Sequence, residues 1–227
     1  MPEGHSLELA ARRLRPIVGA RVEAAPLAGA VVSAVEARGK HLLVHAADGR
    51  CLHAHLGLHG RVSLRPPGEG RGRHVVRTGA GDVVIAGRVE VAARPPRLGL
   101  GPDLLHGSFD AAAYLRRARA VDRAVGEVLV DQRVVAGVGN IVKSEALWAC
   151  RQSPFTPVSA LSDRRLLELA ATARRILRAG LAGRLPANVY RRAGRPCPRC
   201  GSPVASAVQG ELARRTYHCP RCQRDSG

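Results

Sequence analysis

Two cysteine pairs near the C-terminus constrain the fold most. They are Cys197-Pro-Arg-Cys200 and Cys219-Pro-Arg-Cys222, with 18 residues between them. Each pair can bind one side of a tetrahedral zinc ion, and the separation is within the range of a zinc ribbon. Because thiols fill all four positions, no coordination site remains for water, and one structural Zn²⁺ is expected. Two disulfides are the alternative, which a reducing compartment disfavours.

The segment between the pairs is expected to be a β-hairpin. Its strands are predicted at 204–206 and 215–218, with Arg214 near the second pair. By composition alone, Arg214 is one more exposed arginine. The other two cysteines, Cys51 and Cys150, lie in apolar contexts and are predicted to be core thiols.

The chain is strongly basic, with a net charge of +18 over 227 residues. So large an excess favours a polyanionic partner, because binding releases the counterions of the polyanion. A membrane surface is the weaker alternative, since no long basic amphipathic helix stands out. The sequence shows no signal peptide and no long apolar run. We therefore expect a soluble, intracellular protein.

Lysine is almost absent from this basic chain. Of the 36 basic residues, 34 are arginine, and only Lys40 and Lys143 are lysine. A lysine here is therefore a hint of a role that arginine cannot fill, because lysine can release a proton and arginine in practice cannot. Lys40 lies at the entry to a predicted strand, where a solvated strand end is the alternative interpretation.

The stretch 129–149 is predicted to form two helices joined by a tight turn. Gly137 and Gly139 permit backbone conformations that are barred to residues with a β-carbon. Two glycines before a helix N-terminus expose backbone N–H groups to one side, which suits phosphate. Asn140 lies where the second helix should begin, so it can cap that helix or reach the same anion. An ordinary helix corner with an Asn cap is the alternative.

The N-terminal Pro2-Glu3 precedes a predicted helix that Pro16 and Gly19 end. Locally, both residues are ordinary at a helix start. If Met1 is removed, however, Pro2 becomes a free secondary amine, and an α-amine has a pKa of about 7.7–8.0, well below that of lysine. Such an amine attacks an aldehyde carbon to give an iminium, a strong electron sink. Glu3 is then placed to shuttle protons.

Residues 20–100 are predicted to form an antiparallel β-sandwich, because short apolar runs recur between turn signals. The predicted strands are 21–25, 31–37, 41–45, 51–55, 61–64, 74–77 and 83–86. His53 and His55 alternate onto one strand face, so a metal is conceivable there. No Asp or Glu accompanies them in the sequence, which favours a tight apolar turn around Leu58 instead.

After residue 103 the pattern becomes helical. Helices are predicted over 110–119, 121–130 and 163–178, with Ser162 as the N-cap of the last one. That helix is amphipathic and rich in arginine, and its charges are mostly a solvated face. A short Gly/Pro linker over 181–188 follows it.

Together these motifs resemble the formamidopyrimidine-DNA glycosylase / endonuclease VIII family over nearly the whole chain. The matching stretches are MPEG, RGKHLLV with HLGLHG, LVDQRVVAGVGNIVKSEALW, and VYRRAGRPCPRCGSPV with RRTYHCPRCQ. The resemblance implies an α+β multidomain fold with DNA in the cleft between its domains. The implied domains are an N-terminal antiparallel β-sandwich with a leading helix (1–106), a helix-two-turn-helix domain (107–189) and a zinc finger (190–227).

The resemblance also implies a function: a base-excision-repair DNA glycosylase that is also an abasic-site lyase. The damaged base leaves the stack, Pro2 attacks C1′, and the strand breaks by β/δ-elimination without a redox cofactor. The partner is damaged DNA, duplex, single-stranded or bubble, and we expect a cytoplasmic monomer that is nucleoid-associated when on DNA. The resemblance implies that Pro2 is the Schiff-base nucleophile, that Glu3 is the proton donor and that Lys40 supports elimination. It also implies that Arg214 binds phosphate and assists δ-elimination. Asn140 would hold the DNA backbone, and Leu58 would be the wedge that replaces the flipped base.

The sequence departs from the formamidopyrimidine branch in three places. Residues 4–8 read Gly-His-Ser-Leu-Glu where that branch commonly reads Leu-Pro-Glu-Val-Glu, which favours the endonuclease VIII branch and oxidised pyrimidines. The segments before Lys40 and over 181–190 are compressed, which leaves no room for the long loop that covers 8-oxoguanine in the other branch. The Arg-Phe-Gly wedge is also absent, and only Arg88 lies in the corresponding region as a candidate DNA contact.

Two other classes of protein stay open at this point. A non-catalytic damaged-DNA binder on the same fold would keep the zinc and Asn140 but form no covalent DNA adduct. A structural RNA-binding protein would need neither the N-terminal Pro2-Glu3 nor a special lysine.

Overall fold

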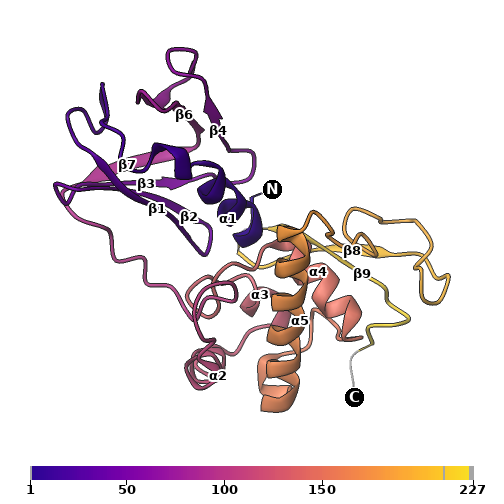
Figure 1. Cartoon of the computed structure of the whole chain (residues 1–227). Coiled ribbons are helices and arrows are strands. Elements are labelled where there is room, and N and C mark those ends of the chain that lie inside the picture. Colours follow the sequence, from indigo (N-terminus) through magenta and orange to yellow (C-terminus); the bar gives the residue numbers. More distant parts are fainter. Residues whose placement is uncertain (1, 212, 225–227) are drawn as a thin grey trace. The chain divides into compact units, whose positions relative to one another are not determined.

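The computed structural model describes residues 2–211 and 213–224 (Figure 1). The chain divides into two compact units, Met1–Gly99 and Leu100–Gly227, and each is described by itself. None of the helices in the described part combines the length and the apolar character that a membrane span requires. The finer division into three domains at 106/107 and 189/190 stays a prediction.

The first unit begins with helix α1 (Gly4–Arg13), followed by the short helix η1 (Arg15–Ile17). The backbone N–H of Glu3 donates to the Ser6 hydroxyl at 2.8 Å, which fixes the first turn of the helix. Leu7 and Leu14 face the core and are fully buried. The predicted leading helix is confirmed.

Two antiparallel sheets make up the rest of the first unit. The larger has the order β1-β2-β3-β7 and the smaller the order β4-β6-β5. Apolar side chains from α1 and from both sheets form one buried cluster, so the predicted sandwich is confirmed. The strands are β1 (Val32–Arg38), β2 (His41–Ala46), β3 (Cys51–His55), β4 (Arg61–Arg65), β5 (His74–Val76), β6 (Asp82–Ala86) and β7 (Arg88–Ala92).

The structure corrects the predicted strands at two places. The segment 21–25 is not a strand, because Arg21 and Val22 form only isolated bridges, to Val31 and Thr78 respectively. Conversely, β7 was not predicted, although it pairs along its whole length with β3. Its residues alternate regularly, but the strand is largely exposed and charged, so no apolar run marks it.

The second unit is mostly helical. Its helices are α2 (Ala111–Arg119), α3 (Val125–Val128), α4 (Asn140–Ala149), η2 (Val158–Ala160) and α5 (Asp163–Leu181). The Ser162 hydroxyl accepts from the backbone N–H of Arg165 at 3.2 Å, which confirms the predicted N-cap of α5. The helix predicted over 121–130 is wrong in length. Its earlier part is not helical, and the N–H groups of Val125 and Gly126 donate to carbonyls of the loop before η2.

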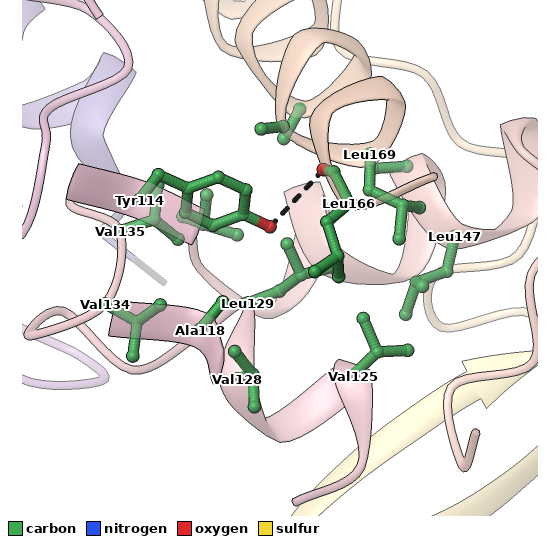
Figure 2. Close-up of a cluster of buried hydrophobic side chains, with 14 of the residues drawn as sticks. Tyr114, Ala118, Val125, Val128, Leu129, Val134, Val135, Leu147, Leu166 and Leu169 are labelled. Atoms are coloured by element: carbon green, nitrogen blue, oxygen red, sulfur yellow. Dashed lines mark hydrogen bonds between the residues drawn. The ribbon is translucent and has the colours of Figure 1, made fainter. Parts of the chain in front are cut away.

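The helices of the second unit pack around one apolar cluster (Figure 2). Leu129 and Leu147 lie in it with almost no exposed surface. Tyr114 is the largest buried side chain, and its hydroxyl donates to the carbonyl of Leu166 at 3.4 Å, so its one polar atom is satisfied. This cluster holds α4 and α5 against each other.

The C-terminal part of the second unit is a two-stranded hairpin of β8 (Ala205–Gln209) and β9 (Arg214–His218). The predicted hairpin is therefore present, although its first strand starts one residue later and runs to Gln209. The predicted core thiols are also confirmed, since Cys51 is fully buried and Cys150 is 8% exposed.

We predict that Leu129→Ala destabilises the second unit by about 2–5 kcal/mol, because it removes buried methyl groups and leaves a cavity. Urea unfolding followed by the fluorescence of Trp148, the single tryptophan of the chain, measures this change. Val208→Ala is the matched control, since Val208 is 62% exposed and its truncation should cost less than about 0.5 kcal/mol. Equal unfolding midpoints for the two variants would contradict the prediction.

Candidate functional site

The turn before α4 is built around Gln132. Its side-chain amide donates to the carbonyls of Val130 and Val138 at 3.1 and 3.0 Å. Its side-chain oxygen accepts from the N–H of Gly137 at 2.9 Å. Gly137 has a φ of +96°, a backbone conformation that favours glycine. Gly139 is instead the N-cap of α4. The two glycines therefore have different structural roles.

Asp131 fixes the chain just before this turn. Its carboxylate accepts from Arg133 at 2.9 Å and from Arg123 at 2.6 Å. Hydrogen bonds from Arg133, and then from Arg123, hold the pKa of Asp131 well below its usual range. The turn that leads to α4 is therefore fixed by an ionised side chain with two arginine partners.

Asn140 is the first residue of α4 and not its cap, so the capping interpretation is wrong. Its side chain instead leaves the helix and donates from Nδ2 to the carbonyl of Arg215 in β9, at 2.8 Å. The residue is only 4% exposed. Its Oδ1 is buried and has no hydrogen-bond partner among the described residues.

Lys143, one turn further along α4, is 1% exposed. Its Nζ donates to the Thr216 hydroxyl at 2.6 Å, and that hydroxyl donates to Gln209 at 2.8 Å. The Gln209 amide then donates to the carbonyl of Pro154 at 2.8 Å. This chain of hydrogen bonds joins α4 to both strands of the hairpin and to the loop after α4.

Glu145 is a buried residue of α4 whose structural role the sequence did not reveal. Both of its carboxylate oxygens are used: Oε2 accepts from the N–H and the side-chain amide of Asn188, and Oε1 from the N–H groups of Val189 and Tyr190. Four donors compensate the burial of its charge. The segment that leads into the cysteine cluster is thereby fixed to α4. A glutamate inside an apolar helix face was the only signal for it.

The four predicted metal ligands lie together. The sulfur atoms of Cys197, Cys200, Cys219 and Cys222 all lie within 4.8 Å of one another. A tetrahedral ion with metal–sulfur bonds of about 2.3 Å needs sulfur–sulfur distances of about 3.8 Å. The Cys200–Cys219 separation is 3.5 Å, so the thiols fit a tetrahedral metal ion.

Neighbouring groups shift the pKa values of these thiols in both directions. Hydrogen bonds from the backbone and then the side chain of Ser202 lower the pKa of Cys200 to about 6, whereas burial raises the pKa values of Cys219 and Cys222. The indole N–H of Trp148, on α4, donates to Cys197 at 3.3 Å. Arg199 lies over the Trp148 ring at 4.1 Å and donates to its carbonyl, so the first cysteine pair is packed onto α4.

Arg214 is the first residue of β9, pairs in register with Gln209, and is partly exposed. It directly precedes Arg215, whose carbonyl Asn140 binds. The structure therefore places two of the predicted site residues, Asn140 and Arg214, on neighbouring elements of the second unit.

Pro2 and Glu3 lie at the start of α1 in the first unit. Glu3 is fully buried, whereas Pro2 is partly exposed. The expected removal of Met1 concerns a residue outside the described part of the chain. The placement of Pro2 just before the helix is consistent with both an ordinary helix start and a free amine.

Lys40, Leu58 and Arg88 lie at one end of the larger sheet. Strand register places His41, His55 and Arg88 side by side across β2, β3 and β7. Lys40 lies in the turn before β2 and is partly buried. Leu58 follows β3 in a tight turn and is 48% exposed, as the apolar-turn interpretation predicts. The Arg88 side chain is 80% exposed and pairs with Glu90 at 2.7 Å.

Comparison with known proteins gives a consistent result. The model of the formamidopyrimidine-DNA glycosylase H2TH domain matches residues 100–187, and that of the N-terminal domain matches residues 23–85. A protein named probable endonuclease 8 2 from Streptomyces coelicolor is 36% identical, with 98% of this chain and 94% of the relative covered.

Solved structures agree. The MutM (Fpg) protein of Thermus thermophilus superposes with a TM-score of 0.84 at 30% identity, with 100% of both chains covered. The Lactococcus lactis glycosylase bound to DNA with an abasic site gives a TM-score of 0.85 at 24% identity over 98% of this chain and 100% of that one, which shows the fold.

We predict that Cys219→Ser releases the metal and unfolds the C-terminal hairpin, since metal binding and folding are coupled in such sites. Metal analysis of the purified protein should fall from one ion per chain to none. Cys150→Ser is the matched control, because this buried thiol donates to Thr172 away from the cluster. A variant at position 219 that keeps a full equivalent of metal would refute the four-thiol site.

Proposed function

Because the chain belongs to the formamidopyrimidine-DNA glycosylase / endonuclease VIII family, we propose that it excises oxidised bases from DNA and then cleaves the strand as an abasic-site lyase. The observation that carries this proposal is the pair Pro2-Glu3. Pro2 lies just before Glu3, the N-cap of α1, and retains exposed surface, while the Glu3 side chain is a fully buried carboxyl group. A secondary amine beside a buried acid is the pair of groups that Schiff-base chemistry requires.

In the proposed reaction, the Pro2 nitrogen forms a bond to C1′ and the bond between C1′ and the base breaks. The base leaves with the electron pair of that bond and takes up a proton, which Glu3 supplies. The nitrogen then loses its proton, its lone pair forms the C=N bond as the C1′–O4′ bond of the sugar ring breaks, and O4′ takes up a proton. The resulting iminium acidifies the hydrogen at C2′. Loss of that proton expels the 3′ phosphate in β-elimination, and a second loss expels the 5′ phosphate in δ-elimination. Water finally hydrolyses the Schiff base and returns the free amine.

The remaining site residues would bind and position the DNA. Lys40 carries an amine that can gain and lose a proton, so it supports elimination as well as phosphate binding. Arg214 offers a guanidinium suited to phosphate. Asn140 is proposed to hold the DNA backbone beside the lesion, and its side chain is positioned by the hydrogen bond from Nδ2 to the carbonyl of Arg215. Leu58 and Arg88 are proposed to contact DNA near the flipped base, from the end of the sheet where Lys40 lies.

We propose oxidised pyrimidines as the favoured lesions. Residues 4–8 lack the pattern of the formamidopyrimidine branch, and the segment over 181–190 is short. A relative named as an endonuclease 8 matches almost the whole chain, which supports the same branch. The damaged DNA is proposed to be bound by a monomer.

We propose that the four thiols hold one structural zinc ion. Four cysteine ligands in a tetrahedral arrangement suit Zn²⁺, which has no redox chemistry of its own. With all four positions filled by protein, the ion would supply folding energy to the hairpin that carries Arg214. None of the proposed chemical steps passes through it.

We predict that borohydride traps the protein covalently on DNA with an abasic or oxidised-pyrimidine site. Hydride reduces the iminium between Pro2 and C1′ to a stable amine. Pro2 is the expected attachment point because an α-amine has a pKa of about 7.7–8.0, against about 10.4 for lysine. Mass spectrometry should place the adduct on the N-terminal peptide lacking Met1.

A tag at the N-terminus should abolish this trapping, and the same tag at the C-terminus is the matched control. Binding to undamaged DNA should stay nearly the same, because one charge is lost among 36 basic side chains. An adduct on Lys40 would show that Lys40, and not Pro2, is the nucleophile. Processed, metal-replete protein that forms no adduct on several lesions would instead support the non-catalytic damage binder.

We predict that Lys40→Arg slows cleavage of abasic DNA by at least about 100-fold, as expected for loss of a general acid or base. DNA affinity should change little, because the positive charge is kept. Single-turnover cleavage and a binding titration separate the two effects. Arg38→Lys, the reverse exchange at an exposed neighbour in the same hairpin, should leave the rate unchanged. Wild-type cleavage by Lys40→Arg would show that Lys40 acts only as a cation.

A further inference from the structure

His5 is a buried polar residue in the first turn of α1 to which the proposed reaction gives no role. It is the second residue of the helix, three residues after Pro2, and only 6% of its surface is exposed. Its Nδ1 is buried and has no hydrogen-bond partner in the part of the chain that the structure describes. A buried polar atom without a partner costs free energy and is uncommon in folded proteins, so this one requires an explanation.

The helix geometry brings the imidazole toward the N-terminus of the chain. Side chains of an α-helix tilt toward its N-terminal end, so that of His5 leans back over the turn that begins at Glu3. The backbone of this turn is fixed, because the Ser6 hydroxyl accepts from the N–H of Glu3 at 2.8 Å and donates to its carbonyl at 2.8 Å. Leu7, two residues after His5, is fully buried in the core. An unpartnered ring nitrogen is therefore held at the end of α1 that Pro2 precedes.

We propose that Nδ1 of His5 accepts the proton that the Pro2 nitrogen loses during Schiff-base formation. This inference rests on the proposed glycosylase and lyase function. After its attack on C1′, the nitrogen is positively charged, and it needs its lone pair back to form the C=N bond. The N–H bond breaks, its electron pair stays on the nitrogen, and the proton moves to Nδ1. The imidazolium can return this proton to O4′ as the C1′–O4′ bond breaks, because the nitrogen and O4′ are both bonded to C1′.

The protonation state of His5 suits an acceptor. Burial first, and then the positive charge of the terminal amine of the chain, lower the pKa of His5 below its ordinary value. The imidazole is therefore neutral near pH 7 and keeps a lone pair on one ring nitrogen. Glu3 has the opposite task in the proposed reaction, since it supplies a proton to the departing base. A second group is thus needed to accept a proton, and His5 meets this need.

Rapid mixing with abasic-site DNA, followed by a borohydride quench at increasing times, measures how fast the adduct forms. His5→Ala should slow adduct formation by at least about 100-fold, as expected for loss of a general base. Its affinity for the same DNA should change little. Imidazole added to His5→Ala should restore part of the rate, because it can enter the space left by the side chain and accept the proton.

His5→Asn distinguishes a proton acceptor from a packing or hydrogen-bonding group. Its amide oxygen accepts a hydrogen bond but does not take up a proton near neutral pH, so this variant should be as slow as His5→Ala. His45→Asn is the matched control and should form the adduct at the wild-type rate. His45 lies on β2 of the same unit and pairs with Glu36 at 3.0 Å.

Circular dichroism and binding to abasic-site DNA show whether each variant is folded. If His5→Ala fails to fold, His5→Asn, which keeps a planar polar side chain, gives the answer. Wild-type protein that forms no adduct would overturn the proposed function and this inference with it. Wild-type rates in His5→Ala or His5→Asn would overturn only the role of His5 and leave Pro2 as the nucleophile. Slow adduct formation by His5→Ala that imidazole does not restore would also overturn that role, because it would indicate packing alone.

Discussion

The carboxylate of Glu145 is the interaction on which the second unit depends. A buried charge is costly unless it is paired or hydrogen-bonded. Here four N–H donors from Asn188, Val189 and Tyr190 surround it. These donors belong to the segment between α5 and the cysteine cluster, which has little secondary structure of its own. Glu145 therefore gives that segment a fixed course along α4, and everything that follows it in the chain starts from this position.

The cysteine cluster and its hairpin are too small to be stable on their own apolar contacts. Their buried cluster contains few apolar side chains, and two of the four fully buried members are cysteines. Domains of this size usually need a metal or a larger partner. Both are available here, because the thiols fit a metal ion and Trp148 of α4 packs against them. The contact of Asn140 with Arg215 and that of Lys143 with Thr216 then align β9 with the same helix.

The sequence predicted the elements that carry a strong local signal. The cysteine spacing, the N-cap Ser162, the leading helix and most of the strands are confirmed. Local reasoning did not find β7, because the charged residues of this strand interrupt its apolar pattern. It also did not find the late start of α3, where loop carbonyls accept hydrogen bonds from the N–H groups of Val125 and Gly126. It also assigned Asn140 as a possible cap. The competing acceptor, the carbonyl of Arg215, is 75 residues away in sequence and becomes visible only after folding.

The two lysines of this protein have different physical explanations. Lys143 is buried, and its ammonium group has only three hydrogens to satisfy, one of which reaches the Thr216 hydroxyl. A guanidinium at the same place would bring five N–H donors and a larger planar group into the core. Lys143 is thus explained by packing between α4 and β9. Lys40 lies in a partly exposed turn. Its proposed role in elimination gives the reason for a lysine there, because its amine can exchange a proton and a guanidinium in practice cannot.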